Sequence, residues 1–337
     1  MLIVASPRFD EHVTPPGHPE RPERAHVFDT VAAAWARKGG NVHAPRPATR
    51  DELLLVHDGS YLDEIAALAG KPAMLDADTF MSPESRDVAL LAAGAAVQAA
   101  EHALDSKEPA FALVRPPGHH AERDRAMGFC LFNNIAVAAA AMRRRGLERI
   151  AIVDIDVHHG NGTQAMFYGT RQVLYVSTHQ YPFYPGTGPV TETGHADGLG
   201  FTVNVPMEAG ATDADYLHVH RAIVSPILDQ YEPQLTLISA GYDAHEHDPL
   251  ASMRMTTSGY AAVVASLRDQ ASRHGPLALV TEGGYELRAL ADCLTASFAV
   301  VDGAPPPSLE VDLTVAQPRA ERAIAAAAAA LRPFWQL

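Results

Sequence analysis

The stretch Ile150-Ala-Ile-Val-Asp-Ile-Asp-Val-His-His-Gly-Asn-Gly162 indicates both the fold class and the site of chemistry. Its four apolar residues, 150–153, predict a strand that is buried on both faces. Asp154, Asp156 and His158 follow at alternate positions, which places three side chains on one side of an extended chain. Ionised groups at the end of a buried strand need partners. The stretch therefore predicts a divalent-metal site, and the alternative is an Asp-rich loop that is solvated at the edge of the sheet.

The composition is that of a globular protein, since 47% of the residues are apolar and 20% are charged. No apolar run approaches the roughly 18 residues that a membrane helix requires. Residues 1–5 lack the basic flank and the length of a signal peptide, and they predict a first strand instead. The two cysteines, Cys130 and Cys293, cannot form a disulfide framework, which fits a reducing compartment. These features predict a cytoplasmic protein.

The formal net charge of −14 argues against direct binding to nucleic acid, for which a basic patch is expected. The charge is compatible with the attraction of cationic substrates, and equally with a surface that is simply solubilised. We therefore expect neither nucleic acid nor a membrane as a partner.

Short apolar strands alternate with amphipathic helices along most of the chain. The predicted strands are 2–5, 42–44, 111–114, 150–153, 173–176, 201–205, 235–238 and 277–280. The predicted helices are 25–37, 60–68, 83–103, 134–145, 213–230, 258–274, 286–300 and a terminal helix around 325–330. Ser82 is predicted to cap the helix that begins at Pro83. This alternation predicts a single α/β domain with a mostly parallel sheet of about eight strands and helices on both faces. Its core would span about 1–303, followed by a helical tail at about 304–337.

Polar residues follow four of the predicted strands. They are the segments Arg115-Pro-Pro-Gly-His-His120, Asp154-Ile-Asp-Val-His158, Ser239-Ala-Gly-Tyr-Asp243 and Thr281-Glu-Gly-Gly-Tyr285. Ligands of open α/β sheets bind beyond the carboxyl ends of the strands. We therefore expect these side chains to meet at one rim.

Three of these residues would supply a metal with protein ligands and leave one position open, and they are Asp156, His158 and Asp243. That pattern is typical of a catalytic zinc site, on which the pKa of a bound water falls toward neutrality. His119 and His120 could act as base and acid beside it. Tyr285 follows two glycines that permit close approach of the backbone. Its phenol could donate a hydrogen bond to a developing oxyanion, or it could simply pack against the sheet.

These motifs resemble those of the zinc-dependent histone deacetylase family, which includes acetylpolyamine amidohydrolases and acetoin-utilisation proteins and has an arginase-like α/β fold. The matching segments are His18-Pro-Glu-Arg-Pro-Glu-Arg24, Arg115-Pro-Pro-Gly-His-His120, Gly128-Phe-Cys130, Phe132-Asn-Asn134, Asp154-Ile-Asp-Val-His-His-Gly-Asn-Gly162, Phe183-Tyr-Pro-Gly-Thr-Gly188, Asn204-Val-Pro206, Ser239-Ala-Gly-Tyr-Asp243 and Glu282-Gly-Gly-Tyr285. They follow the order of the family and cover most of the chain.

The resemblance implies a role for each polar residue of the rim. The implied zinc ligands are Asp156, His158 and Asp243. His120 would be the general base, and Tyr285 would polarise the acetyl carbonyl. His119 would be the electrostatic partner, hydrogen-bonded to Asp154. Asn161 would orient His120, and because it is neutral it would raise the basicity of His120 less than the Asp of several family members would. The Asn is similar to that of the class II branch.

The resemblance further implies a monovalent-cation site, usually potassium. The site would use Asp154 and Ser177 with backbone oxygens of Asp156, His158 and Thr178. A second cation site would lie near Phe167, Thr170, Val173 and Phe201.

The resemblance also implies a tunnel for the acyl-lysine stem, lined by Gly128, Phe129 and Tyr184. Asp78 would contact the substrate backbone at the rim, and Arg24 would lie near an inner acetate pocket. Apolar walls suit the methylenes of the stem and exclude water.

Two features depart from the family pattern. His245 and His247 follow Asp243, and arginases place a second metal ligand two residues after the equivalent Asp. His245 could therefore touch a second ion, or it could be a loop histidine near the rim. The stretch 63–87 is compact, whereas the acetylpolyamine branch usually carries a long insertion before its His pair.

The sequence therefore predicts a zinc-dependent amidohydrolase that removes a short acyl group, acetyl above all, from acylated lysine or a related amine. One alternative is a deacetylase of small N-acetyl amines such as acetylpolyamines. Another is an acyl-lysine binding protein without turnover, which predicts the loss of Tyr285 or of the His pair. Tyr285, His119 and His120 are all present.

Overall fold

The computed structural model describes residues 1–309 and 317–337. Eight strands form one sheet in the order β2-β1-β5-β10-β9-β6-β7-β8, and every pairing in it is parallel. The strands are β1 (Leu2–Val4), β2 (Asn41–His43), β5 (Ala110–Ala112), β6 (Ile150–Asp154), β7 (Val173–Gln180), β8 (Thr202–Met207), β9 (Leu235–Ala240) and β10 (Leu277–Thr281). The predicted α/β fold with about eight strands is confirmed.

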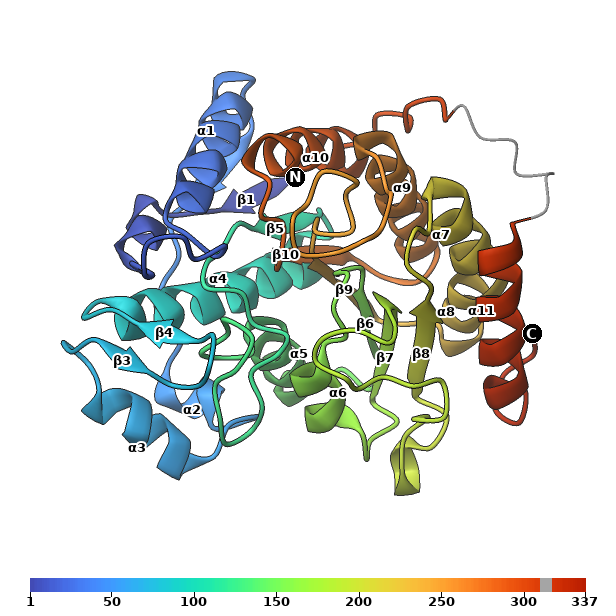
Figure 1. The fold of residues 1–337 in the computed structure, drawn as a ribbon, viewed down its shortest axis with the longest axis horizontal. Helices are drawn as coiled ribbons and strands as arrows, with labels where there is room; N and C mark the ends of the chain where they lie inside the picture. Colours follow the sequence, from blue (N-terminus) through green and yellow to red (C-terminus); the bar gives the residue numbers. More distant parts are fainter. Residues whose placement is uncertain (310–316) are drawn as a thin grey trace.

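Helices cover both faces of the sheet (Figure 1). They are α1 (Glu23–Arg37), α2 (Arg50–Leu53), α3 (Gly59–Ala67), α4 (Ser85–Ser106), α5 (Asn134–Arg144), α6 (Asn161–Phe167), α7 (Asp213–Val219), α8 (Ser225–Tyr231), α9 (Thr257–His274), α10 (Leu287–Val301) and α11 (Pro318–Leu331). Short 3-10 helices span Pro7–Glu11 and Ala196–Gly198, and a π-helical segment (His220–Val224) joins α7 to α8.

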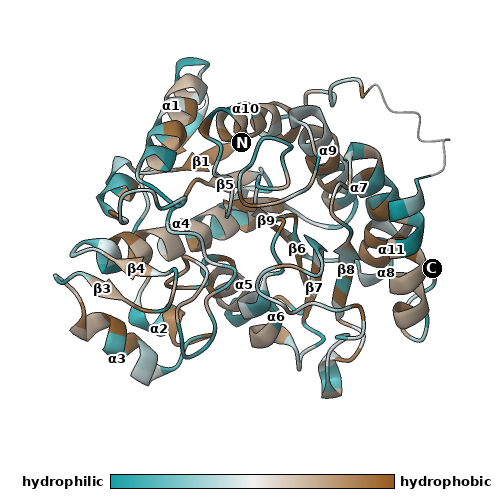
Figure 2. Cartoon of the chain, viewed as in Figure 1, coloured by the Kyte–Doolittle hydropathy of each residue, from teal (hydrophilic) through white to brown (hydrophobic). Residues whose placement is uncertain are grey.

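Alternate residues of the central strands enter two separate cores. Ala151 and Val153 of β6 belong to the core that α1, α9 and α10 cover, whereas Ile150 and Ile152 belong to the core that α4 and α5 cover. This follows from the two-residue period of a strand that is buried on both faces. In Figure 2 the hydrophobic residues concentrate in the central strands, and the hydrophilic ones lie toward the periphery. Within the described ranges, none of the helices is both long and apolar enough to cross a membrane.

Two local predictions around residue 80 are wrong. Helix α4 begins at Ser85 rather than Pro83, and its first turn is preceded by Glu84 instead of a capping Ser82. The Ser85 hydroxyl accepts a hydrogen bond from the Ser82 backbone N–H at 2.7 Å, which holds residues 82–85 in a turn before the helix starts. Just before this turn, β4 (Phe80–Met81) pairs with β3 (Ala73–Met74) in a separate two-stranded antiparallel sheet.

The C-terminal helix α11 packs against α7 and the edge strand β8. The Trp335 indole N–H, just beyond that helix, donates to the Gly200 carbonyl at 2.7 Å. The predicted tail begins within residues that the structure describes, but part of it, 310–316, lies outside the described residues.

The sheet order determines where the site forms. The strands β5, β10, β9 and β6 are consecutive neighbours, and all four run parallel. The loops that follow them therefore emerge at one edge, as the sequence predicts.

Candidate metal centre and substrate tunnel

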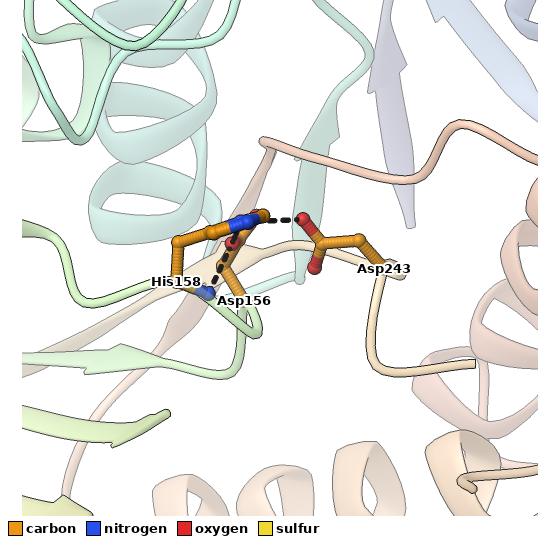
Figure 3. Close-up of side chains that lie close together, drawn as sticks. All are labelled: Asp156, His158 and Asp243. Atoms are coloured by element: carbon orange, nitrogen blue, oxygen red, sulfur yellow. Dashed lines mark hydrogen bonds and ion pairs between the residues drawn. The ribbon is translucent and has the colours of Figure 1, made fainter. Parts of the chain in front are cut away.

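Asp156, His158 and Asp243 converge at the carboxyl ends of β6 and β9. One ligand atom from each lies within 4.8 Å of the others, and all three residues are buried. His158 Nδ1 lies 3.2 Å from Asp156 Oδ1 and 3.1 Å from Asp243 Oδ2, with the imidazole pointing toward both carboxylates (Figure 3). The structure thus brings together the three residues that the resemblance implies as metal ligands.

Backbone N–H groups from neighbouring loops hold the two carboxylates. The Gly283 N–H donates to Asp156 Oδ2 at 2.8 Å, and the Val157 N–H donates to Asp243 Oδ1 at 2.9 Å. Gly283 must be glycine here, because a Cβ on it would lie 2.1 Å from Asp243 Oδ2. The loops that follow β6, β9 and β10 therefore lie close enough for the backbone of one to contact the side chains of another.

The charge balance of this cluster favours a cation. Burial raises the pKa of Asp243 to about 7, and the nearby Asp156 charge adds to the effect. Burial alone would lower the pKa of His158, but the Asp156 and Asp243 carboxylates raise it to about 10. Two buried carboxylates beside an imidazole need a positive charge between them. Oxygen and imidazole ligands that leave a position open fit a catalytic divalent metal such as zinc.

His119 and His120 are neighbours in sequence with opposite pKa shifts. Their ring centroids lie 4.0 Å apart. Burial lowers the pKa of His119, but the charges of Asp156 and Asp154 outweigh it and raise the pKa to about 10. Burial and the charges of His119 and His158 lower the pKa of His120. The pKa values of the two rings are therefore displaced in opposite directions.

Separate partners fix the two rings. His119 Nδ1 lies 3.0 Å from Asp154 Oδ2, and His120 Nδ1 lies 2.8 Å from Asn161 Oδ1. Both of these implied hydrogen bonds are present. Gly128, at φ +57°, leaves room for the His120 ring, because a Cβ there would lie 2.4 Å from His120 Cδ2.

A cavity of about 200 Å³ leads to this cluster. It is lined by Asp78, His120, Gly128, Phe129, His158, Phe183, Tyr184, Leu250 and Tyr285. The set includes the predicted tunnel residues and the predicted rim residue Asp78. The Phe183 ring stacks on His158 with a centroid distance of 5.6 Å, and Tyr184 presents its ring at 5.2 Å from His120.

Tyr285 is held by its backbone and ring rather than by its hydroxyl. Asp248 Oδ2 accepts a hydrogen bond from the Tyr285 N–H at 2.6 Å, and the Arg24 guanidinium lies 5.0 Å from the ring centroid. Arg24 is buried, and its Nε donates to the Gly284 carbonyl at 2.8 Å. Burial raises the pKa of Tyr285, so the phenol keeps its proton at neutral pH.

The histone deacetylase domain model matches residues 18–301 of this chain. The chain belongs to the histone deacetylase family. The coverage includes all four loops that build the metal cluster and the cavity.

Similar sequences and a similar solved structure agree with this assignment to the histone deacetylase family. A probable deacetylase of Archaeoglobus fulgidus is 40% identical over 291 residues, covering 85% of this chain and 81% of that protein. A histone deacetylase-like amidohydrolase of Pseudomonas aeruginosa is 41% identical over 285 residues, covering 81% of this chain and 74% of that protein. The crystal structure of the HDA15 HD domain superposes with a TM-score of 0.93 at 34% identity, covering 99% of this chain and 94% of that chain. Its family and the names of these relatives together indicate that this protein is a hydrolase of the deacetylase class.

The residues of the implied inner cation site are adjacent in the sheet. The β6–β7 register places Asp154 opposite Ser177, and both are buried. The Ser177 hydroxyl lies 2.9 Å from His179 Nδ1, and Thr178 is the next residue of the strand. The monovalent cation itself stays a prediction, as does the second site near Phe201.

His245 does not join the metal cluster. Among the described residues, Asp156, His158 and Asp243 form the only cluster of three or more His, Cys, Asp or Glu side chains close enough to share a metal ion, and His245 is not part of it. His245 Nε2 lies 3.4 Å from the Thr257 hydroxyl, and its ring lies 5.2 Å from that of His247. The geometry favours a loop histidine over a ligand of a second ion.

Three carboxylates with roles around the site were not predicted. Asp248 binds the Tyr285 backbone, and Glu282 Oε2 accepts from the N–H groups of Gly118 at 2.6 Å and His119 at 3.1 Å. Glu122 accepts from the Asn161 side chain at 2.7 Å. Their partners lie far away in sequence, so spacing gives no signal for them; only the position of Glu282 within the Glu-Gly-Gly-Tyr motif could have suggested one.

Proposed function

We propose that this histone deacetylase-family protein is a zinc-dependent amidohydrolase that removes an acetyl group from an acylated lysine side chain or a related amine. One observation carries the proposal: a single narrow cavity reaches His120, His158 and Tyr285 and has aromatic walls above them. A metal ligand, a candidate base and a candidate oxyanion donor thus face the same small volume.

The chemistry divides among these residues. A zinc ion held by Asp156, His158 and Asp243 would supply Lewis-acid polarisation of the acyl carbonyl. His120 is neutral and its Nδ1 is engaged by Asn161, so Nε2 is the nitrogen that can take a proton from water. Tyr285, which stays protonated, can donate to the oxygen on which negative charge develops.

His119 complements this arrangement as a fixed positive charge. Burial opposes a charge on this ring, but the Asp154 carboxylate, which binds Nδ1 and is not one of the three zinc ligands, favours the protonated form. A cationic neighbour disfavours protonation of His120 before reaction, which keeps the base in its useful form. It also adds positive potential where an oxyanion would form.

The walls favour an acylated side chain with a stem of methylenes. The apolar surface comes from Phe129, Phe183, Tyr184 and Leu250, and among the described residues Asp78 is the one carboxylate in the lining. A polyamine carries further ammonium groups that need carboxylate partners, so we place acyl-lysine first and small N-acetyl amines second. Burial raises the pKa of Asp78, and the negative charge of the neighbouring Asp76 adds to this effect. Two carboxyl groups close together at the rim offer partners to an ammonium group, which keeps the small N-acetyl amines as the second candidate.

The test is a comparison of kcat/KM for an acetyl-lysine peptide and a mono-N-acetylated diamine, using protein reconstituted with zinc. A preference for the peptide of tenfold or more, roughly 1.4 kcal/mol, would support acyl-lysine as the substrate class. The opposite preference would assign the chain to small acetylated amines.

A matched control uses His120→Ala, which removes the base but none of the metal ligands. Its metal content should equal that of the unmodified protein, and its turnover should be lost. If the loaded protein hydrolyses neither substrate yet binds the acetyl-lysine peptide, the non-catalytic alternative is correct and the proposal is wrong.

A further inference from the structure

A half-buried carboxylate, Glu122, lies at the end of a hydrogen-bond chain that begins at His120. His120 Nδ1 lies 2.8 Å from Asn161 Oδ1, and Asn161 Nδ2 donates to Glu122 Oε1 at 2.7 Å. The other Glu122 oxygen, Oε2, forms an ion pair with Arg125 at 2.8 Å. The chain therefore runs from the cavity wall to a partly solvated ion pair.

The Glu122 carboxylate determines which way the Asn161 amide points. A carboxylate only accepts hydrogen bonds, so it selects the NH₂ end of the amide and leaves the oxygen to face His120. The NH₂ group has two weaker contacts, the His120 carbonyl at 3.3 Å and the Met127 sulfur at 3.2 Å. Neither has the charge that shortens and strengthens the contact with Glu122.

The direction of the Asn161 amide in turn sets the tautomer of His120. With the amide oxygen at Nδ1, this nitrogen must carry the proton, and Nε2 is left as an acceptor. A reversed amide would present N–H to Nδ1 and would place the proton on Nε2. The ring could not then remove a proton at the position that the proposed function requires.

We propose that Glu122 is a positioning residue that fixes the Nδ1–H tautomer of His120 through Asn161. The inference rests on the proposed function, because it gives His120 the role of base. This role is separate from holding the loop in place, because the backbone of Glu122 has hydrogen-bond partners that do not involve its side chain. His57 Nδ1 lies 2.9 Å from the Glu122 carbonyl, and the Glu122 N–H donates to the Arg125 carbonyl at 3.0 Å.

The decisive variant is Glu122→Gln, which has the same shape but an amide that can either donate or accept. It can hydrogen-bond to Asn161 in both orientations, so it no longer selects one tautomer. A general base contributes 10²- to 10⁴-fold, and partial loss of the correct tautomer should lower kcat roughly tenfold. KM should stay within about threefold, because no wall of the cavity changes.

A direct readout is the ¹⁵N NMR signal of His120 in protein with labelled histidine, assigned by its disappearance in His120→Ala. The unmodified protein should show the Nδ1–H form, and Glu122→Gln should show a mixture with the Nε2–H form. The control is Arg125→Ala, which breaks only the exposed ion pair and should leave both the tautomer and kcat within about threefold.

A double variant tests the route through Asn161. In an Asn161→Ala background, Glu122→Gln should cause no further loss of kcat, because the connecting amide is gone. Full kcat and an unchanged tautomer in Glu122→Gln, or losses that simply add in the double variant, would overturn the inference. Failure of the proposed function looks different: either the unmodified, zinc-loaded protein would hydrolyse neither substrate, or His120→Ala would keep the full activity.

Discussion

Replacing Tyr285 with Phe isolates the proposed oxyanion donor from everything else in the site. The Tyr285 hydroxyl makes no hydrogen bond to any described residue, and the side chain lines the cavity. The ring keeps its contacts in the variant, with Arg24 at 5.0 Å and Phe129 at 5.8 Å. The backbone N–H also keeps its bond to Asp248. The substitution therefore removes one donor without opening a cavity.

The expected loss follows from what such a donor contributes. One preorganised donor to an oxyanion is worth about 3–4 kcal/mol, so Tyr285→Phe should lower kcat by 10²- to 10³-fold. No internal hydrogen bond is broken, so the free energy of unfolding should change by less than about 0.5 kcal/mol. The metal content should be unchanged, because none of the three metal-cluster residues contacts the hydroxyl within hydrogen-bond range.

The assay combines steady-state kinetics on an acetyl-lysine peptide with metal analysis and thermal unfolding of the same samples. Tyr184→Phe is the matched control, since it removes another phenol of the same cavity, beside His120. We expect its kcat to fall by less than about fivefold, because its proposed role is to form the wall. Full activity in Tyr285→Phe, or equal losses in both variants, would refute the assignment of the donor.

Three further predictions concern the metal, the packing of the base and the acid stability of the fold. Complete removal of divalent metal should abolish turnover and lower the Tm, because two buried carboxylates lose their counter-charge, and added zinc should restore both quantities. Gly128→Ala should lower kcat by about tenfold or more, because the added Cβ would lie 2.4 Å from His120 Cδ2 and would displace the ring. The control is Gly146→Ala, which is also at positive φ but has nothing within 4 Å of the added Cβ, and its kcat should be unchanged. His220→Leu should become more stable than the unmodified protein as pH falls from 6.5 to 4, by up to about 3 kcal/mol in urea unfolding, because burial lowers the pKa of His220 to about 4. Its folded pKa lies below the unfolded value, so the unmodified protein loses stability through that window, and a difference that does not vary with pH would contradict the reasoning.

The strands were predictable because parallel strands buried on both faces are continuous apolar runs. Because this rule detects only apolar residues, it also explains the main error in strand length, which is that the strand predicted at 173–176 extends to Gln180. Strand β7 continues from its apolar half through Ser177, Thr178, His179 and Gln180, which are polar but buried. Their strand conformation depends on pairing with β6 and β8 and on internal polar partners, and no local pattern reports such partners. Pairing with the neighbouring strands therefore extends β7 beyond the end of its apolar run.

Helix α6 (Asn161–Phe167) is a second element whose formation depends on tertiary contacts and not on its local sequence pattern. Its sequence starts at Asn161-Gly162 and includes only seven residues, so propensity and periodicity both argue against it. Position 162 requires glycine because the segment around Ala121 passes very close to it: a Cβ on Gly162 would lie 2.1 Å from the Ala121 carbonyl oxygen. A short helix placed here brings Asn161 to His120, and that contact spans 41 residues.

The convergence of Asp156, His158 and Asp243 was predictable and the carboxylates that support the site were not, for one physical reason. Each of the three candidate ligands lies in a motif whose spacing reflects the chemistry of a metal ligand. Two of the supports, Asp248 and Glu282, accept backbone N–H groups, and almost any residue can offer an N–H group. Asp248 holds Tyr285 in this way over 37 residues, and Glu282 holds His119 over 163 residues. Such contacts depend on where the loops meet rather than on which residues they contain.

These supports also link the four loops to one another. A carboxylate of the β6 loop, Asp156, binds the β10 loop at Gly283; Glu282 at the end of β10 binds the β5 loop at His119. Asp243 of the β9 loop binds the β6 loop at Val157, so three of the four loops each hold another loop of the rim through a carboxylate. The position of the base relative to the metal cluster is then a property of the whole rim. Disturbing one carboxylate should displace groups on another strand, and tolerance to substitution at this edge should be lower than burial alone suggests.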